Sequence, residues 1–218
     1  MNWNETGIHA MHTGDYKEAA KAFTQAIEQE PENEVGYINF GNLLAIMNDA
    51  ERAERFFQKA LTLNEQAATA YYGLANLYYN QERFEEAAKL YERAIRANLE
   101  GADGHYMLSK SLQMTDERKL ALPYAQRAHE LAPEDAEITL HYAILLASNE
   151  LFAEAKPLLE QLLEENPEHA DAHYNLGVLF ALTQEDPEPA LHHLDKALEI
   201  EPNYDQARYM ADMIRLRN

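Results

Sequence analysis

Residues 71 to 94 read YYGLANLYYNQERFEEAAKLYERA, and the rest of the chain repeats this pattern. In the second half of the stretch, Ala87 and Ala94 are small residues seven positions apart, with the large Tyr91 between them. Residues at this spacing share one face of a helix, and small side chains on that face let a second helix approach closely. In the first half, the aromatic Tyr71 is followed four positions later by the small Ala75, where the second helix would cross. The stretch therefore predicts a helix-turn-helix unit made of a helix A and a helix B.

The same pattern recurs with a shift of 34 residues. On helix B, the first small position holds Ala19, Ala53, Ala87, Ala121, Ala155 and, one residue late, Ala190. The large position holds Phe23, Phe57, Tyr91, Ala125, Leu159 and Leu194. The second small position holds Ala26, Ala60, Ala94, Ala128, Leu162 and Ala197. On helix A, the aromatic residues or their substitutes are Trp3, Tyr37, Tyr71, His105, Thr139 and His173. The small position of helix A holds Gly7, Gly41, Ala75, Ser109, Ala143 and Gly177. A period of this length is typical of stacked helical hairpins that share one core.

We expect six repeats in one continuous domain that spans residues 1–218. Their approximate limits are residues 1–33, 34–67, 68–101, 102–135, 136–169 and 170–204. Residues 203–217 are expected to form a capping helix with one apolar stripe and a polar outer face. The stripe consists of Tyr204, Ala207, Met210 and Ile214, surrounded by Asp205, Arg208, Asp212 and Arg215.

Prolines and capping residues mark the ends of the helices. Turns between helices A and B are expected at Thr13-Gly14-Asp15, Asn48-Asp49 and Asp186-Pro187. Repeats are closed by Pro31, Pro133, Pro167 and Pro202, because a proline cannot continue the preceding helix. Pro123 and Pro157 instead fall inside helix B, where each should remove one backbone hydrogen bond and bend the helix. Repeats 4 and 5 match the pattern least, and repeat 6 carries a one-residue insertion near Asp186 that we expect in a turn.

The period and the residue order resemble the tetratricopeptide repeat, whose pattern runs Trp, Leu-Gly, Tyr, then Ala, Phe, Ala and Pro. The clearest copies are Tyr174-Asn175-Leu176-Gly177 and the stretch from Tyr71 to Tyr78. The resemblance covers residues 1–202 and implies an all-α, right-handed superhelical solenoid of six tetratricopeptide repeats plus a C-terminal capping helix. Three shorter stretches, residues 37–40, 69–73 and 120–124, also resemble a small bacterial member of the family. This implies a cytosolic bacterial interaction module.

Charge and composition limit the partners. The 218 residues carry 38 acidic and 18 basic side chains, a formal charge of -20. Such a surface repels phosphates, so we expect no nucleic-acid partner. The charge either serves solubility or attracts a basic partner. The chain has no cysteine, no secretion signal at its N-terminus and no apolar run long enough to cross a bilayer. We therefore expect a cytoplasmic location and no membrane partner.

No sequence motif indicates catalysis. A phosphate-binding glycine loop, a G-x-S-x-G elbow and an H-E-x-x-H pair are all missing from the sequence. His169 with His173, and His192 with His193, have spacings that could suggest a metal, but His173 stands at the aromatic packing position and the other pair falls on helix B. Paired carboxylates such as Glu85-Glu86 are typical of a solvated helix face. We expect no catalytic residue, no metal and no cofactor.

The family resemblance implies that helix A lines the concave inner wall, where a partner would bind. The candidate peptide-binding groove comprises Asn4, Ile8, Ile38, Asn42, Tyr72, Asn76, Tyr79, Asn80, Tyr106, Lys110, Leu140 and Tyr174. Helix A does not need these residues to pack on helix B, and tyrosine buries much area at little entropic cost, so a protein-binding groove explains them. The alternative is that Tyr72, Tyr79 and Tyr106 only support neighbouring helices.

These observations predict a non-enzymatic scaffold that binds a peptide or helix of a partner protein and is itself a monomer. Some relatives bind the C-terminal carboxylate of chaperones through lysine, arginine and asparagine, but the corresponding positions here hold Ile38, Asn42, Gly73, Asp103 and Met107. An acid at a lysine position argues against that ligand. The other two hypotheses are a structural module that self-associates through the ends of its solenoid and an accessory subunit of an enzyme complex.

Overall fold

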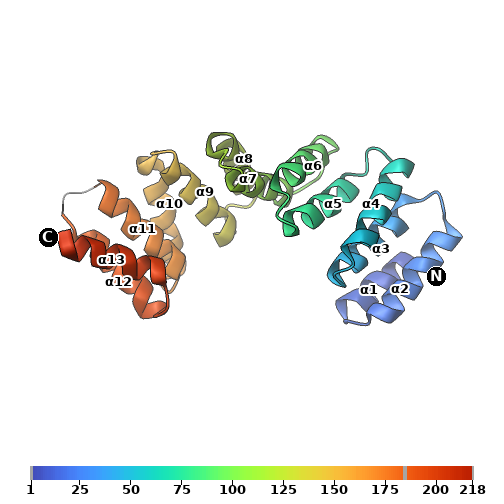
Figure 1. Ribbon diagram of the computed structural model, residues 1–218, viewed down its shortest axis with the longest axis horizontal. Helices are drawn as coiled ribbons and strands as arrows, with labels where there is room; N and C mark the ends of the chain where they lie inside the picture. Colours follow the sequence, from blue (N-terminus) through green and yellow to red (C-terminus); the bar gives the residue numbers. More distant parts are fainter. Residues whose placement is uncertain (1, 184–185, 218) are drawn as a thin grey trace. The chain divides into compact units, whose positions relative to one another are not determined.

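The computed structural model describes residues 2–183 and 186–217. These residues form 13 α-helices and no β-strand, so the all-α prediction is confirmed (Figure 1). The helices are α1 (Trp3–His12), α2 (Tyr16–Gln29), α3 (Glu34–Ile46), α4 (Ala50–Leu63), α5 (Ala68–Asn80), α6 (Phe84–Arg96), α7 (Asp103–Met114), α8 (Arg118–Leu131), α9 (Ala136–Ser148), α10 (Phe152–Glu165), α11 (Ala170–Thr183), α12 (Glu188–Ile200) and α13 (Asp205–Arg217). Odd numbers from α1 to α11 are the predicted helices A, even numbers are the helices B, and α13 is the capping helix.

The chain divides into two compact units, residues 1–117 (unit 1) and residues 118–218 (unit 2). The boundary falls in the turn between α7 and α8, inside the predicted repeat 102–135. This is one of the two repeats that match the sequence pattern least. The single continuous domain stays a prediction.

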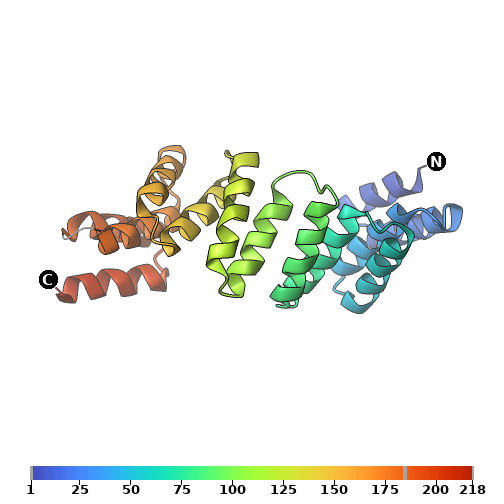
Figure 2. The same cartoon turned by 90° about the horizontal axis from the view of Figure 1, so that it is seen from above.

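In unit 1, α1, α3 and α5 each pack against their own helix B, and each helix B packs against the next helix A. Helices α1 and α3 are also in contact, as are α3 and α5 (Figures 1 and 2). Within residues 2–117, successive helices B have no comparable contact. Because the helices A touch one another while the helices B are further apart, the helices A form the inner, concave side of this unit.

Unit 2 follows the same plan. Helices α9 and α10 form one hairpin, α11 and α12 form the next, and α13 packs against both α12 and α11. Ala207 and Ala211 of α13 are fully buried with Leu194 and Ala197 of α12. The expected stripe residues Tyr204, Met210 and Ile214 pack against this cluster, which confirms the capping helix.

The interface between helices A and B follows the predicted columns. Every residue of the three helix B columns is at most 7% exposed. The small residues of helix A face the large residues of helix B, because a Cβ atom at Gly7 would lie 2.3 Å from Cε1 of Phe23. At Gly177 a Cβ would lie 2.9 Å from Cγ of Leu194. Glycine therefore permits the close approach, and the predicted register is confirmed.

The turns between helices A and B share one backbone conformation. Their left-handed residues are spaced by 34 and have positive φ angles: Gly14 (77°), Asn48 (60°), Glu82 (59°), Asp116 (62°) and Glu150 (64°). The residue that follows Gly14 or Asn48 caps the next helix, since Asp15 accepts from the amide of Glu18 at 3.0 Å and Asp49 from that of Arg52 at 3.3 Å. The expected turns at residues 13–15 and 48–49 are confirmed.

The connection between repeats also has a recurring hydrogen bond. The residue at the aromatic position of helix A donates to the carbonyl oxygen six residues earlier. The pairs are Tyr37 with Pro31 (3.1 Å), Tyr71 with Glu65 (3.2 Å), Thr139 with Pro133 (3.3 Å), His173 with Pro167 (3.1 Å) and, in α13, Arg208 with Pro202. Each bond fixes the entry of a helix A against the loop before it.

Pro123 and Pro157 lie inside α8 and α10, as predicted, and each helix continues through its proline. Asp186 accepts from the amide of Glu188 at 3.0 Å at the start of α12. The predicted insertion adjoins residues 184–185, which lie outside the described part of the chain.

Candidate functional site

Most of the predicted groove residues come from the helices A of unit 1. The partly or fully exposed members form a surface that we call the A face: Asn4, Ile8, Asn42, Tyr72, Asn76, Tyr79, Asn80, Tyr106 and Lys110. Leu140 and Tyr174 belong to α9 and α11 of unit 2.

Two of the predicted lining residues are not at the surface. Ile38 is 6% exposed and Leu140 is 9% exposed, so neither has much area left to bury against a ligand. Leu140 packs with Ala143 and Leu146 in the core of unit 2. The A face is therefore defined without these two residues, because both are buried.

Two tyrosines of the A face also support their own repeat. The ring of Tyr72 lies 5.7 Å from that of Tyr91, and the ring of Tyr79 lies 5.2 Å edge-on from that of Phe84. Burial raises the pKa of Tyr72, with a further contribution from the charge of Asp103, and burial alone raises the pKa of Tyr79. The prediction that helix A packs on helix B without these residues was therefore wrong for Tyr72 and Tyr79. Each ring has one side against helix B and part of its surface exposed.

Asn76 has a structural role as well. The hydroxyl of the fully buried Tyr91 donates to Oδ1 of Asn76 at 2.6 Å. Burial raises the pKa of Tyr91, so this hydroxyl stays protonated and acts as a donor. The equivalent of Tyr91 one repeat earlier is Phe57, which has no hydroxyl to donate to Asn42.

The remaining residues of the A face differ in how firmly they are held. Nδ2 of Asn39 donates to Oδ1 of Asn4 at 3.0 Å, which joins α3 to α1. Nζ of Lys110 donates to the Tyr106 hydroxyl at 3.2 Å and lies 4.9 Å from the centre of that ring. Asn80 is exposed at the end of α5. The A face thus presents amides, phenol rings and one ammonium group.

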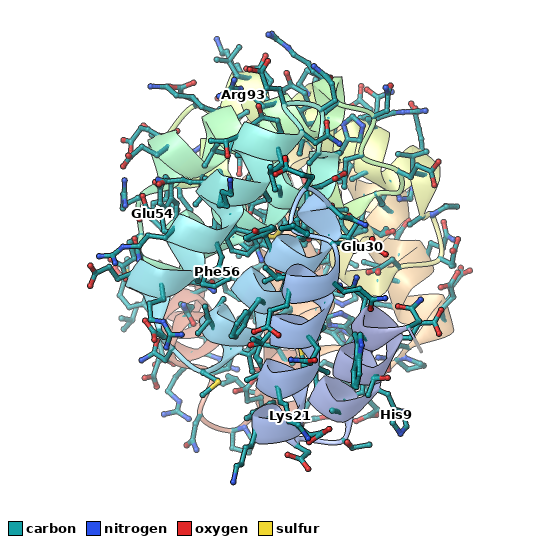
Figure 3. The ribbon with its side chains drawn as sticks, turned by 90° about the vertical axis from the view of Figure 1, so that its right-hand side faces the viewer. His9, Lys21, Glu30, Glu54, Phe56 and Arg93 are labelled. Atoms are coloured by element: carbon teal, nitrogen blue, oxygen red, sulfur yellow. The ribbon has the colours of Figure 1, made fainter. Side chains whose placement is uncertain are left out.

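The helices B of unit 1 carry a different chemistry. Lys21, Glu54 and Arg93 project from α2, α4 and α6 (Figure 3). Exposed ion pairs run along these helices, among them Lys21 with Glu18 at 3.6 Å. Such pairs contribute little to stability and mark a solvated surface. The nine residues of the A face include one charged side chain, Lys110, whereas ion pairs run along the helices B.

Comparison with known proteins identifies the family. Models of the tetratricopeptide repeat match residues 2–33, 44–110 and 143–207. YrrB of Bacillus subtilis is 54% identical over 41 residues, which are 19% of this chain and 20% of that protein. The crystal structure of YrrB, described as a tetratricopeptide-repeat protein with an unusual peptide-binding site, matches with a TM-score of 0.83 at 44% identity and covers 89% of this chain and 100% of that one. The chain belongs to the tetratricopeptide-repeat family.

More distant structures share the fold alone. PilF of Pseudomonas aeruginosa has a TM-score of 0.82 at 16% identity and covers 97% of this chain and 96% of that one. MamA has a TM-score of 0.71 at 20% identity and covers 81% of this chain and 96% of that one. Tetratricopeptide-repeat proteins mediate protein–protein interactions, and their fold is typically not catalytic.

The sequence interpretation missed three exposed apolar residues of the capping helix. Tyr209 is 64% exposed, Met213 49% and Leu216 84%. Tyr209 and Met213 stand 35 residues after Tyr174 and Val178, so they continue the positions of helix A that form the A face in unit 1. Applying the one-residue insertion of repeat 6 to these columns would have found them. The expected polar residues Asp205, Arg208, Asp212 and Arg215 are also exposed, so the outer side of α13 is mixed and not only polar.

The histidines associate differently from their spacing in the sequence. Nδ1 of His173 lies 2.9 Å from Nδ1 of His193, and the latter ring stacks on Phe180 at 5.6 Å. Across residues 2–183 and 186–217, no three histidine, aspartate or glutamate side chains converge as a metal site would require. The ring of Tyr174 in the same unit lies 5.0 Å from that of Tyr204, at a tilt, and so joins α11 to the residue that precedes the capping helix. None of the described helices is both long and apolar enough to span a bilayer.

Proposed function

We propose that this tetratricopeptide-repeat protein is a non-enzymatic scaffold that holds a peptide or a helix of a partner protein on the A face of unit 1. The contrast between the two sides of the unit carries the proposal. The inner side presents partly exposed tyrosines and neutral amides, whereas the outer side presents solvated ion pairs. Aromatic rings with a polar end, set beside amides, suit peptide side chains and peptide backbone.

The relationship to YrrB supports the same function. That protein is 44% identical over most of this chain and is described as having a peptide-binding site. The formal charge of -20 supports a partner with basic segments, because opposite charge speeds association and is screened by salt. In this proposal the chain is a cytoplasmic monomer.

The test begins with affinity capture of partners from cytosol and then measures the affinity of a purified partner by calorimetry. Asn42→Arg with Asn80→Arg places two long cations on the A face. We expect affinity to fall about tenfold or more, because a bulky charge in the centre of an interface costs binding energy. The helical content should be unchanged.

The matched control is Gln25→Arg with Gln58→Arg, which adds the same charge on α2 and α4. We expect its affinity for the partner to stay within about twofold of the wild type. Equal loss in both double variants would mean that only net charge matters. Unchanged affinity in both double variants would mean that the partner does not bind on the A face.

Self-association is a second candidate, favoured by the exposed Tyr209, Met213 and Leu216 of α13. Light scattering over a range of concentrations distinguishes the two functions. A mass that grows with concentration, and returns to the monomer value in Leu216→Glu, would support assembly through the capping helix. A constant monomer mass would exclude it.

A further inference from the structure

A pocket of about 460 Å³ opens beside the A face of unit 1. It lies where the first turns of α1 and α3 meet the last turn of α2. Its lining residues are Asn2, Trp3, Asn4, Ala26, Gln29, Glu30, Asn33 and Val35. Asn4 belongs to the A face, so a peptide on that face would pass the mouth of the pocket. Glu30 lies just beyond the C-terminal end of α2 (Figure 3).

One carboxylate and one indole give this pocket its chemistry. The carboxylate of Glu30 accepts from Nδ2 of Asn33 at 2.7 Å, which holds it beside the pocket. Oδ1 of the same Asn33 accepts from the amide of Val35 at 3.0 Å and caps α3. Asn33 thus ties the carboxylate to a helix end. Trp3 is partly exposed and is the only tryptophan of the chain.

The surrounding backbone also favours a positive ligand. The C-terminal end of a helix carries partial negative charge, and the last turn of α2 contains no basic residue to offset it. The opposite ends of α1 and α3, which carry partial positive charge, are already capped by Asn2 and Asn33. Within residues 2–183 and 186–217, no residue that lines the pocket is basic. Glu30 is therefore the one charged side chain among the described lining residues.

We propose that this pocket binds the guanidinium group of an arginine side chain from the partner peptide, an inference that rests on the proposed function. A guanidinium is planar, stacks on an indole face and forms paired hydrogen bonds with a carboxylate. Trp3 supplies the face and Glu30 the carboxylate, while Asn4 and Gln29 offer amide oxygens for the remaining N–H groups. The pocket therefore selects arginine at one place along the peptide.

The single tryptophan makes the test local. We would add N-acetyl-arginine-N-methylamide to the whole protein and follow Trp3 fluorescence, with the citrulline analogue as a neutral probe of the same shape. We expect a saturable change with the arginine probe, weakened by salt, and binding of the citrulline probe at least about threefold weaker. No saturable change, or equal binding of both probes, would overturn the proposal.

Two variants separate the pocket from the general negative charge. Glu30→Gln removes the charge but keeps an oxygen for Asn33, so the fold should be retained. Glu28→Gln removes the same charge two residues earlier, in the last turn of α2, and Glu28 does not line the pocket. We expect Glu30→Gln to weaken the arginine probe about threefold or more and Glu28→Gln to change it less than about twofold. Equal effects of the two variants would mean that the probe responds only to the general negative charge, and the proposed arginine site would be wrong.

The outcome is independent of the A-face experiment. If a partner loses affinity through Asn42→Arg with Asn80→Arg but binds Glu30→Gln as tightly as the wild type, the proposed function stands and the arginine pocket fails. If the probe binds Trp3 while no partner responds to the A-face variants, the pocket exists and the proposed function fails.

Discussion

Repeats 2 and 3 place an asparagine at the same point of helix A but use it differently. In repeat 3, the buried hydroxyl of Tyr91 donates to Asn76 at 2.6 Å. In repeat 2, the residue opposite Asn42 is Phe57, which has no hydroxyl. The hydroxyl of Tyr91 on helix B therefore engages the amide of Asn76 in a hydrogen bond inside repeat 3, which Asn42 lacks in repeat 2. Equal spacing identifies equal positions, but the partner across the interface decides whether a side chain is available to a ligand.

A substitution in the core that repeats 2 and 3 share should cause the largest loss of stability. Phe57 is fully buried, and a Cβ atom at Gly41 or Gly73 would lie 2.9 or 2.5 Å from its Cε1. Phe57→Ala would leave a cavity between α3, α4 and α5. We expect a loss of about 3–5 kcal/mol in the free energy of unfolding, measured with urea. A loss below about 1 kcal/mol would mean that the repeats do not depend on this ring.

The difference between the repeats is tested by the two asparagines. Asn76→Ala leaves the Tyr91 hydroxyl buried without its acceptor, so we expect a loss of about 1–3 kcal/mol. Asn42→Ala should stay within about 0.5 kcal/mol of the wild type. Adding Tyr91→Phe to Asn76→Ala should recover part of the loss, since the orphaned hydroxyl is removed. Equal losses in the two single variants would show that both asparagines have the same role.

Repeat 6 varies another shared position, where Tyr71 of repeat 3 is replaced by His173. Nε2 of His173 donates to the Pro167 carbonyl at 3.1 Å, so its Nδ1 accepts from His193. Burial lowers the pKa of His173. Burial and, as the smaller cause, the charge of the neighbouring His173 lower the pKa of His193 to about 4. His192 and Lys196 oppose protonation of His173 further, and Glu168 favours it.

Both histidines are therefore neutral in the folded chain, which makes stability depend on pH. The contribution of His193 is complete above the unfolded pKa of about 6.5 and is lost as the pH falls from there toward about 4, because the unfolded chain binds more protons. The contribution of His173 is lost in the same direction. Allowing for the partial exposure of His193, we expect a loss of about 1–2 kcal/mol. His193→Phe should make unfolding in urea less dependent on pH over this window, and the exposed control His9→Gln should not. Parallel pH profiles for His193→Phe and the wild type would contradict this.

Periodicity predicted the residues that pack helix A against helix B in every repeat. The columns around Ala87 and Tyr91 recur because the two helices pack in the same way in each repeat, and the same side chains are buried in the structure. Contacts across the fold could not be predicted in this way. Ile38 and Tyr72 share a position, yet their different lengths leave one buried and the other partly exposed. The pair His173 and His193 is 20 residues apart and forms only when α11 packs on α12.

The smallest expected effect concerns a conformation that the repeats share although their residues differ. Each described turn between helices A and B has a left-handed residue, which is Asn48 in repeat 2 and Glu82 in repeat 3, at φ angles of 60° and 59°. This conformation costs an ordinary L-residue about 1–2 kcal/mol, whereas asparagine adopts it more readily because its short side chain forms hydrogen bonds with the nearby backbone. Glu82→Asn should therefore raise the urea midpoint by the equivalent of about 0.5–1 kcal/mol, and Asn48→Glu should lower it by a similar amount. Since Glu82→Asn also removes one negative charge, Glu82→Gln is the matched control and should leave the midpoint nearly unchanged. If Glu82→Gln stabilises the chain as much as Glu82→Asn does, the gain comes from charge and the turn exerts no preference.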